Sequence, residues 1–207
     1  MPLPEYVYAV MHDGNKNFLM FKKNTMGYFY KGRATQSSGI RIPHGGGKCA
    51  LPGGGVDEYP KIPVEEDGQG NPKCQKERIS KEAIREFREE TAAGISGLQC
   101  VCRGWKHYGR KRCYYYGVYF LCTPEQLIDG HAAVAKTLEV GAIASQSVKN
   151  GAIPEGRIIA EHHCPAPLDN ELCSVEKWNF TEKRSLIRSW RTDNDLSWFT
   201  VILENLP

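Results

Sequence analysis

The sequence lacks any apolar run of eighteen or more residues, the length that an α-helix needs to cross a bilayer. It also lacks an excess of one charge, because 27 Lys and Arg stand against 24 Asp and Glu, a formal net charge of +3. This balance disfavours a nucleic-acid coat protein or an acidic tail protein. The first residues do not have the basic-then-apolar layout of a signal peptide. We therefore expect a cytoplasmic protein with no membrane partner.

Zinc-binding cysteine spacing is also missing. The eight cysteines include Cys100-x-Cys102, and Cys164 follows two histidines, but neither cluster has the paired two-residue spacing of a structural zinc site. Cysteines such as Cys113 and Cys122 fall at strand-like positions, and the length does not require a disulfide scaffold. The sequence thus predicts reduced, mostly buried thiols.

The length of 207 residues and the absence of an internal repeat indicate a single domain, 1–207. Two runs rich in glycine or proline, 24–48 and 58–76, are expected to be loop insertions, and an Ala-rich stretch near 124–148 is expected to be a helical insertion of one or two helices. Apolar alternation and turn residues predict strands at 6–11, 18–22, 98–107, 112–122, 157–161 and 172–180. Helical spacing of apolar residues predicts a C-terminal helix over 194–206.

The segment 77–94 contains no proline and no glycine before its last residue, and it is rich in Glu, Arg, Lys and Ala. Its apolar residues recur at helical spacing, which predicts a short amphipathic helix. Glu86 and Glu90 are one turn apart with Glu89 beside them, so carboxylates that repel one another gather on one side. Clustered carboxylate oxygens suit a hard divalent cation, Mg²⁺ or Mn²⁺.

Two glycine-containing segments precede this helix. Gly53, Gly54 and Gly55 follow a short strand, and such glycines let backbone N–H groups approach an anion or simply form a turn. The loop 24–48 carries Tyr28, Arg33 and Arg41, a combination of rings and cations that suits a nucleotide base and its phosphates. A solvated surface loop explains the same residues equally well.

These residues resemble the box of the Nudix hydrolase family. Arg85-Glu86-Phe87-Arg88-Glu89-Glu90 matches its central core, Glu77 stands at the family's offset before Arg85, and Leu51-Pro-Gly-Gly-Gly-Val56 is similar to its lead-in, with Gly54 as the box glycine. The match departs at two points. Twenty-two residues separate Gly54 from Glu77 where the family has five, and Ala92-Ala93 follows Thr91 where the family has glycine.

The resemblance implies a Nudix-like α/β/α sandwich with a mixed β-sheet. It further implies hydrolysis of the pyrophosphate in a nucleoside diphosphate derivative by an activated water, with Mg²⁺ or Mn²⁺. Glu86, Glu89, Glu90 and Gly54 would bind the metal. Arg85 and Glu77 would contact these ligands and orient them without binding the metal themselves. Glu89 or Glu90 would be the general base, or else a carboxylate from a later loop, for which Glu171 is the first choice. Tyr28, Arg33 and Arg41 are the candidates for substrate binding.

Other readings remain open at this point. The hairpin around Gly109-Arg-Lys-Arg112 interleaves cations with Trp105, Tyr108 and Tyr114, a pattern that suits RNA, so an enzyme acting on RNA ends is an alternative that we do not favour over a nucleotide substrate. A Nudix fold that senses nucleotides without hydrolysing them is a third reading, although all three helix carboxylates are present. A homodimer leaves no clear trace in a sequence.

Overall fold

The computed structural model describes residues 3–27, 40–42, 45–56, 64–107, 112–150, 167 and 170–207. Its strands are β1 (Glu5–His12), β2 (Asn17–Lys23), β3 (Met26–Gly27), β4 (Ile40–Arg41), β5 (Cys49–Ala50), β6 (Gly53–Gly55), β7 (Gln99–His107), β8 (Cys113–Leu121) and β9 (Leu172–Asn179). Its helices are α1 (Lys76–Thr91), α2 (Pro124–Lys149), α4 (Phe180–Ser189), α5 (Ser197–Glu204) and the 3-10 turn η2 (Trp190–Thr192). Neither α2 nor any other described helix combines the length and apolar content needed to cross a bilayer.

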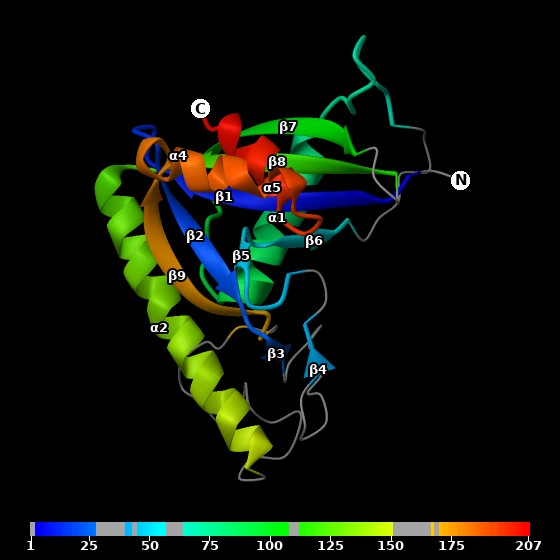
Figure 1. Cartoon of the computed structure of the whole chain (residues 1–207). Coiled ribbons are helices and arrows are strands. Elements are labelled where there is room, and N and C mark those ends of the chain that lie inside the picture. The colour runs from blue at the N-terminus through cyan, green and yellow to red at the C-terminus, as the bar shows by residue number, and fades with distance from the viewer. Residues whose placement is uncertain are drawn as a thin grey trace.

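A seven-stranded mixed sheet lies between two layers of helices (Figure 1). β8 runs parallel to β1 and antiparallel to β7, so the sheet contains both kinds of pairing. Alternation along β1 divides its side chains between the layers: Glu5 bonds to α1, whereas the ring of Tyr8 packs edge-on against Phe199 of α5 at 5.0 Å. The predicted α/β sandwich with a mixed sheet is confirmed.

Strands β1 and β2 form the predicted hairpin but stay together only at its turn. Their backbones pair at His12 and Phe18, whereas the other edge of β2 pairs with β9 along its whole length, from Asn17 opposite Asn179 to Lys23 opposite Leu172. Residues 48–56 occupy the resulting wedge, because β5 pairs with the end of β2 and β6 pairs with the start of β1. The divergence of β1 and β2 thus places the three glycines of β6 inside the sheet layer, next to α1.

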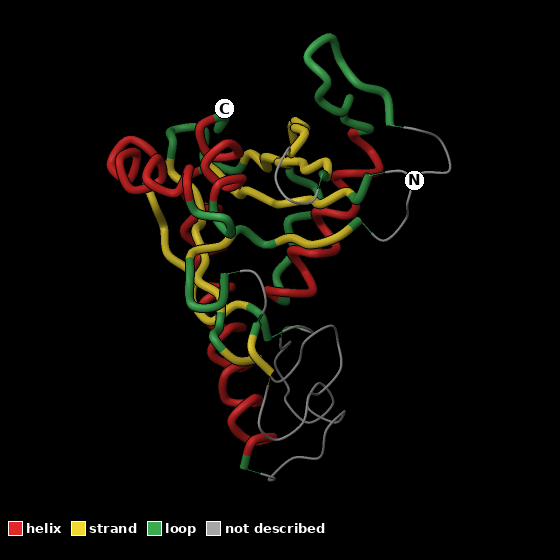
Figure 2. Tube along the Cα trace, turned by 45° about the vertical axis from the view of Figure 1, so that its right-hand side comes forward, coloured by secondary structure: helices red, strands yellow, loops and turns green. Residues whose placement is uncertain are grey.

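Most predicted elements are found, with shifted ends. The hairpin 98–107 and 112–122 is β7–β8, and the Ala-rich stretch is one continuous helix, α2, whose C-terminal part extends beyond the strands (Figures 1 and 2). The strand expected over 172–180 ends at Asn179, and the C-terminal helix is confined to Ser197–Glu204. The strand expected at 157–161 lies outside the described residues. Among the described residues of the predicted loop insertion 24–48, the two-residue strands β3 and β4 pair with each other.

The prediction that the cysteines are reduced thiols is wrong for two of them. Cys74 and Cys102 form a disulfide with their Cα atoms 6.2 Å apart, within the usual range for such bonds. The spacing of these two cysteines does not predict the bond, because the bond depends on the docking of the residues before α1 onto β7. Cys113 and Cys122 are buried free thiols, as predicted, and burial raises the pKa of both.

Candidate active site

Helix α1 is held by one apolar face. Ile79, Ala83 and Phe87 recur at helical spacing and are buried against the sheet, where Phe87 meets the ring of Phe21 edge-on at 6.1 Å. Burial of this face fixes the positions of the side chains on the other faces of the helix. Glu86, Glu89 and Glu90 therefore have defined positions relative to β6.

Arg85 neutralises much of the negative charge on this helix. Its guanidinium donates hydrogen bonds to Glu82 (2.9 Å), Glu86 (2.7 Å) and Glu89 (2.8 Å). Burial alone would lower the pKa of Arg85, but these carboxylates together raise it, so the group stays charged. The predicted contact with Glu89 is confirmed, and those with Glu82 and Glu86 extend it.

The glycines of β6 lie directly against the carboxylates of α1. A Cβ placed on Gly54 would be 2.8 Å from Oε2 of Glu86, closer than such atoms approach. The backbone N–H of Gly53 donates to Oε2 of Glu90 at 3.4 Å, and Glu90 is only 4% exposed. Only glycine at position 54 therefore leaves room beside the Glu86 carboxylate.

Three carboxylates thus differ in their surroundings. The side chain of Glu86 is 12% exposed and Glu90 is buried, whereas Glu89 is 36% exposed. All three present hard oxygen donors of the type that Mg²⁺ and Mn²⁺ prefer, and two of them adjoin β6, Glu86 at Gly54 and Glu90 at Gly53. Within the described residues, no three acidic, His or Cys side chains are already arranged around a common point suitable for a metal. The chemistry of the donors therefore fits a divalent cation, although the side chains as the structure places them do not surround one.

Glu171, the predicted outside base, stands at the start of β9. Its carboxylate forms an ion pair with Lys23 at the end of β2, and both side chains are largely buried. Burial raises the pKa of Tyr8 in β1, and among the smaller causes are the negative charges of both Glu171 and Glu90. The two carboxylates are thus near enough to the same phenol to act on it. Sequence reasoning missed Lys23, because its partner is 148 residues away.

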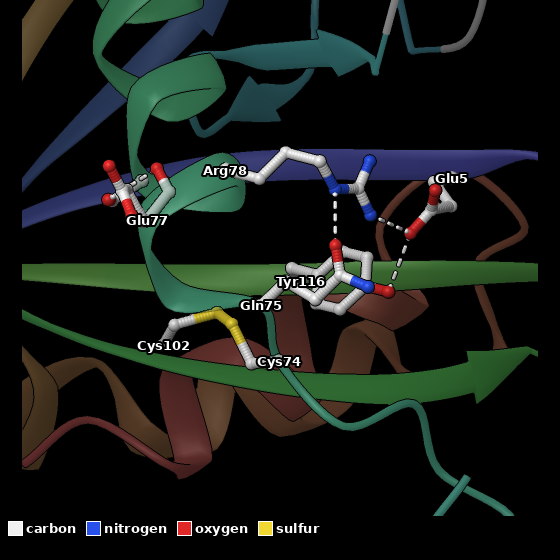
Figure 3. Close-up of a disulfide and its surroundings, with 8 residues drawn as sticks. Glu5, Cys74, Gln75, Glu77, Arg78, Cys102 and Tyr116 are labelled. Carbon is white, nitrogen blue, oxygen red and sulfur yellow. Dashed lines mark hydrogen bonds and ion pairs between the residues drawn. A yellow bond between two sulfur atoms is a disulfide. The ribbon is translucent and has the colours of Figure 1, made fainter. Parts of the chain in front are cut away.

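The remaining predicted residues are not brought to this cluster. Glu77 is exposed in the first turn of α1, nine residues before Glu86 and so about 13 Å away along the axis. Figure 3 shows it directed away from the contact between Arg78 and Glu5. This position matches a helix-start acid that favours the positive end of the dipole. Arg41 is exposed on β4, and Tyr28 and Arg33 lie outside the described residues.

Comparisons with known proteins agree with the sequence resemblance only at the level of shape. No family model and no curated protein matches the chain. Among solved structures, it is similar to the NUDIX domain of Shewanella oneidensis NrtR complexed with ADP ribose, with 12% identity, a TM-score of 0.41 and coverage of 98% of this chain and 84% of that one. A NUDIX hydrolase from Nitrosomonas europaea is 11% identical, with a TM-score of 0.40 and coverage of 98% of this chain and 88% of that one. A MutT protein from Methanosarcina mazei is 16% identical, with a TM-score of 0.31 and coverage of 57% of this chain and 63% of that one. With TM-scores below 0.5, these similarities assign neither a reaction nor a ligand to this chain.

Proposed function

We propose that this chain is a Nudix-type hydrolase that cleaves the pyrophosphate linkage of a nucleoside diphosphate derivative with Mg²⁺ or Mn²⁺. The observation that carries the proposal is the meeting of α1 and β6, where Glu86 and Glu90 lie against Gly54 and Gly53, two positions at which an added Cβ would meet an atom within 3.0 Å. Carboxylates packed on bare backbone are expected where a metal and phosphate oxygens must be held together.

Glu86, Glu89 and Glu90 would hold the metal, which when bound neutralises phosphate charge and lowers the pKa of a bound water. Gly53 and Gly54 would let a phosphate come close to the backbone of β6. Arg85 would keep the carboxylates in position between catalytic cycles, because it already bonds to Glu86 and Glu89. These roles need no residue outside α1 and β6.

Glu171 would accept the proton from the attacking water. Its ion pair with Lys23 holds it just before β9, beside the end of β2. Glu89 and Glu90 are the alternatives for this role, as they adjoin the metal-binding oxygens themselves. A carboxylate beside a metal-bound water is suited to general-base catalysis in either position.

The test is turnover of a panel of nucleoside diphosphate derivatives, including ADP-ribose, nucleotide sugars and dinucleoside polyphosphates, with Mg²⁺ or Mn²⁺. The variant Glu89→Gln with Glu90→Gln should lose more than about 100-fold of the activity, beyond the loss that outer partners of a metal cause. Glu82→Gln is the matched control, because Glu82 bonds to Arg85 on the same helix but is not a proposed ligand. Full activity in the double variant would refute the assignment.

Glu171→Gln separates the base from the metal ligands. If Glu171 is the base, this variant should bind Mn²⁺ as the unmodified protein does, yet turn over far more slowly. Normal turnover would transfer the role to Glu89 or Glu90. Capped or triphosphorylated RNA belongs in the same panel, since the RNA-end alternative predicts cleavage of these and of no free nucleotide.

A further inference from the structure

The Cys74–Cys102 disulfide closes a loop around the whole of α1. The two cysteines are 28 residues apart, and the chain between them consists of α1, its exit and the first part of β7. Figure 3 shows the bond joining the segment just before the helix to the neighbouring strand. The helix that carries the proposed metal ligands is therefore tied covalently to the sheet at its start.

Among the described residues, the start of α1 is also held by a small set of side-chain contacts. Gln75, the N-cap residue, makes no side-chain capping bond to the first turn, so the helix lacks the usual stabilisation there. Arg78 donates to Gln75 at 3.0 Å and to the buried Glu5 at 2.8 Å, and Tyr116 donates to the same Glu5 oxygen at 2.7 Å. The disulfide and this polar cluster hold the first turn together with the buried side chain of Ile79.

The surroundings of Cys74 favour opening of the bond. Cys74 is half-buried between the exposed Lys73 and Gln75, and it directly precedes the positive end of α1. The Lys73 ammonium is ion-paired with Glu65 at 3.0 Å, so the nearby helix N-terminus is the feature that would stabilise a thiolate at Cys74. A stabilised thiolate is a good leaving group in disulfide exchange. A pocket of about 500 Å³, lined by Gln75, Lys76, Glu77, Arg78, Lys81 and Glu82, opens beside it to solvent.

We propose that Cys74–Cys102 is a redox switch that controls the order of the first turn of α1 and, through it, the hydrolase. The regulatory part of this inference rests on the proposed function. One thiolate of a dithiol reductant attacks Sγ of Cys102, the S–S bond breaks, and Cys74 leaves as the thiolate. The second thiol of the reductant then displaces Cys102, so the reductant becomes a disulfide and the protein gains two electrons and two protons.

Opening the bond loosens the helix start without releasing the segment before it. Pro72 remains packed on Gly104 of β7, where an added Cβ would meet it at 2.8 Å. Lys106 and Tyr114 remain bonded to Glu66. The loosening therefore begins in the few residues between Cys74 and the buried Ile79, and this first turn is continuous with the part of α1 that carries the carboxylates.

The experiment compares the oxidised protein with the same protein treated with dithiothreitol under native conditions. Alkylation and peptide mapping establish whether Cys74 and Cys102 have become thiols, and hydrogen exchange reports on the amides of 76–82. We expect exchange there to accelerate by about tenfold while that of β8 is unchanged, together with a several-fold loss of turnover.

Two variants sharpen the result. Cys74→Ser with Cys102→Ser should behave as the reduced protein and ignore dithiothreitol, whereas Cys100→Ser, which removes a free thiol from the same strand, should respond as the unmodified protein does. Resistance of the bond to the dithiol, or unchanged exchange after alkylation of both cysteines, would overturn the switch. Changed exchange with turnover unchanged would overturn its control of the hydrolase. No hydrolysis in either redox state, with exchange changed, would defeat the proposed function and leave the redox-controlled helix start standing.

Discussion

At the scale of single residues, Arg85 explains how α1 tolerates its acidic side. Carboxylates one turn apart destabilise a helix, but a guanidinium shared by Glu82, Glu86 and Glu89 converts the repulsion into ion pairs. The spacing of Arg85 and Glu89 predicts one of these contacts from the sequence. The contact with the adjacent Glu86 was not predicted, because neighbouring residues on a helix do not normally face each other.

Gly54 is the residue whose replacement most directly tests the site. Gly54→Ala would place a Cβ 2.8 Å from the Glu86 carboxylate, so this side chain must move away from β6. We expect a loss of turnover of about tenfold or more, since small displacements at a catalytic centre are costly, and a destabilisation of about 1–3 kcal/mol from overpacking. Steady-state kinetics and urea unfolding measure the two effects.

Gly55→Ala is the matched control for this substitution. Gly55 belongs to the same short strand, but a Cβ there would meet no atom within 4 Å. Its turnover and unfolding midpoint should stay close to those of the unmodified protein. Equal losses in both variants would show that β6 needs glycine for its backbone and not for the space beside Glu86.

At the scale of elements, the end of α1 accounts for the departure of this sequence from the Nudix pattern. Ala92 stands where the family has glycine, and it adopts the left-handed conformation with φ 56° that glycine ordinarily takes at a helix end. The hydroxyl of Thr91 bonds to the Phe87 carbonyl at 2.5 Å and accepts the N–H of Ala93 at 3.2 Å. The helix therefore ends in a left-handed residue without a glycine at that position.

This conformation predicts that Ala92→Gly stabilises the protein. Left-handed backbone costs an L-residue about 1–2 kcal/mol, and the greater freedom of glycine in the unfolded chain offsets part of the gain. The net increase in the free energy of unfolding should be roughly 0.5–1 kcal/mol, measured by urea unfolding. Ala93→Gly is the control, because φ of Ala93 is not positive, and it should be neutral or slightly destabilising. A loss of stability in Ala92→Gly would show that the left-handed backbone at Ala92 is not strained.

Elements with a strong local pattern were predictable, and those set by a local cap or by long-range docking were not. The apolar face of α1 and the hairpin β7–β8 follow from residue spacing. Helix α4 was missed because its start depends on the Asn179 side chain, which accepts the N–H groups of Thr181 (2.9 Å) and Glu182 (3.4 Å) directly after a strand. The boundary between β9 and α4 is thus a single capping residue between Trp178 and Phe180.

At the scale of the whole molecule, the candidate site is assembled by contacts that no local pattern encodes. Gly53 and Glu90 are 37 residues apart, and Lys23 and Glu171 are 148 apart, yet the first pair meets where α1 packs on β6 and the second where β9 begins beside the end of β2. The sequence identified most of these residues through the resemblance. It did not predict the divergence of β1 and β2, because a strand's own pattern does not say which neighbour it follows.

Because the carboxylates come together only in the folded chain, metal binding should stabilise the whole fold. A cation that binds the folded state alone adds RT ln(1 + [L]/Kd) to the free energy of unfolding, about 2.7 kcal/mol at 100 times Kd. For a chain of this length, such a gain should raise Tm by roughly 5–11 °C. Thermal unfolding with Mn²⁺ or Mg²⁺, against NaCl of equal ionic strength, measures the shift without any substrate.

The variant carrying Glu86→Gln, Glu89→Gln and Glu90→Gln isolates the site in the same measurement. It keeps the length and polarity of the three side chains but removes the charges that would attract the cation, so its Tm should be the same in Mn²⁺ and in NaCl. A Tm increase equal to that of the unmodified protein would place the stabilising cation elsewhere. No increase in the unmodified protein, at millimolar metal, would contradict the proposal that these carboxylates form a metal site in the absence of substrate.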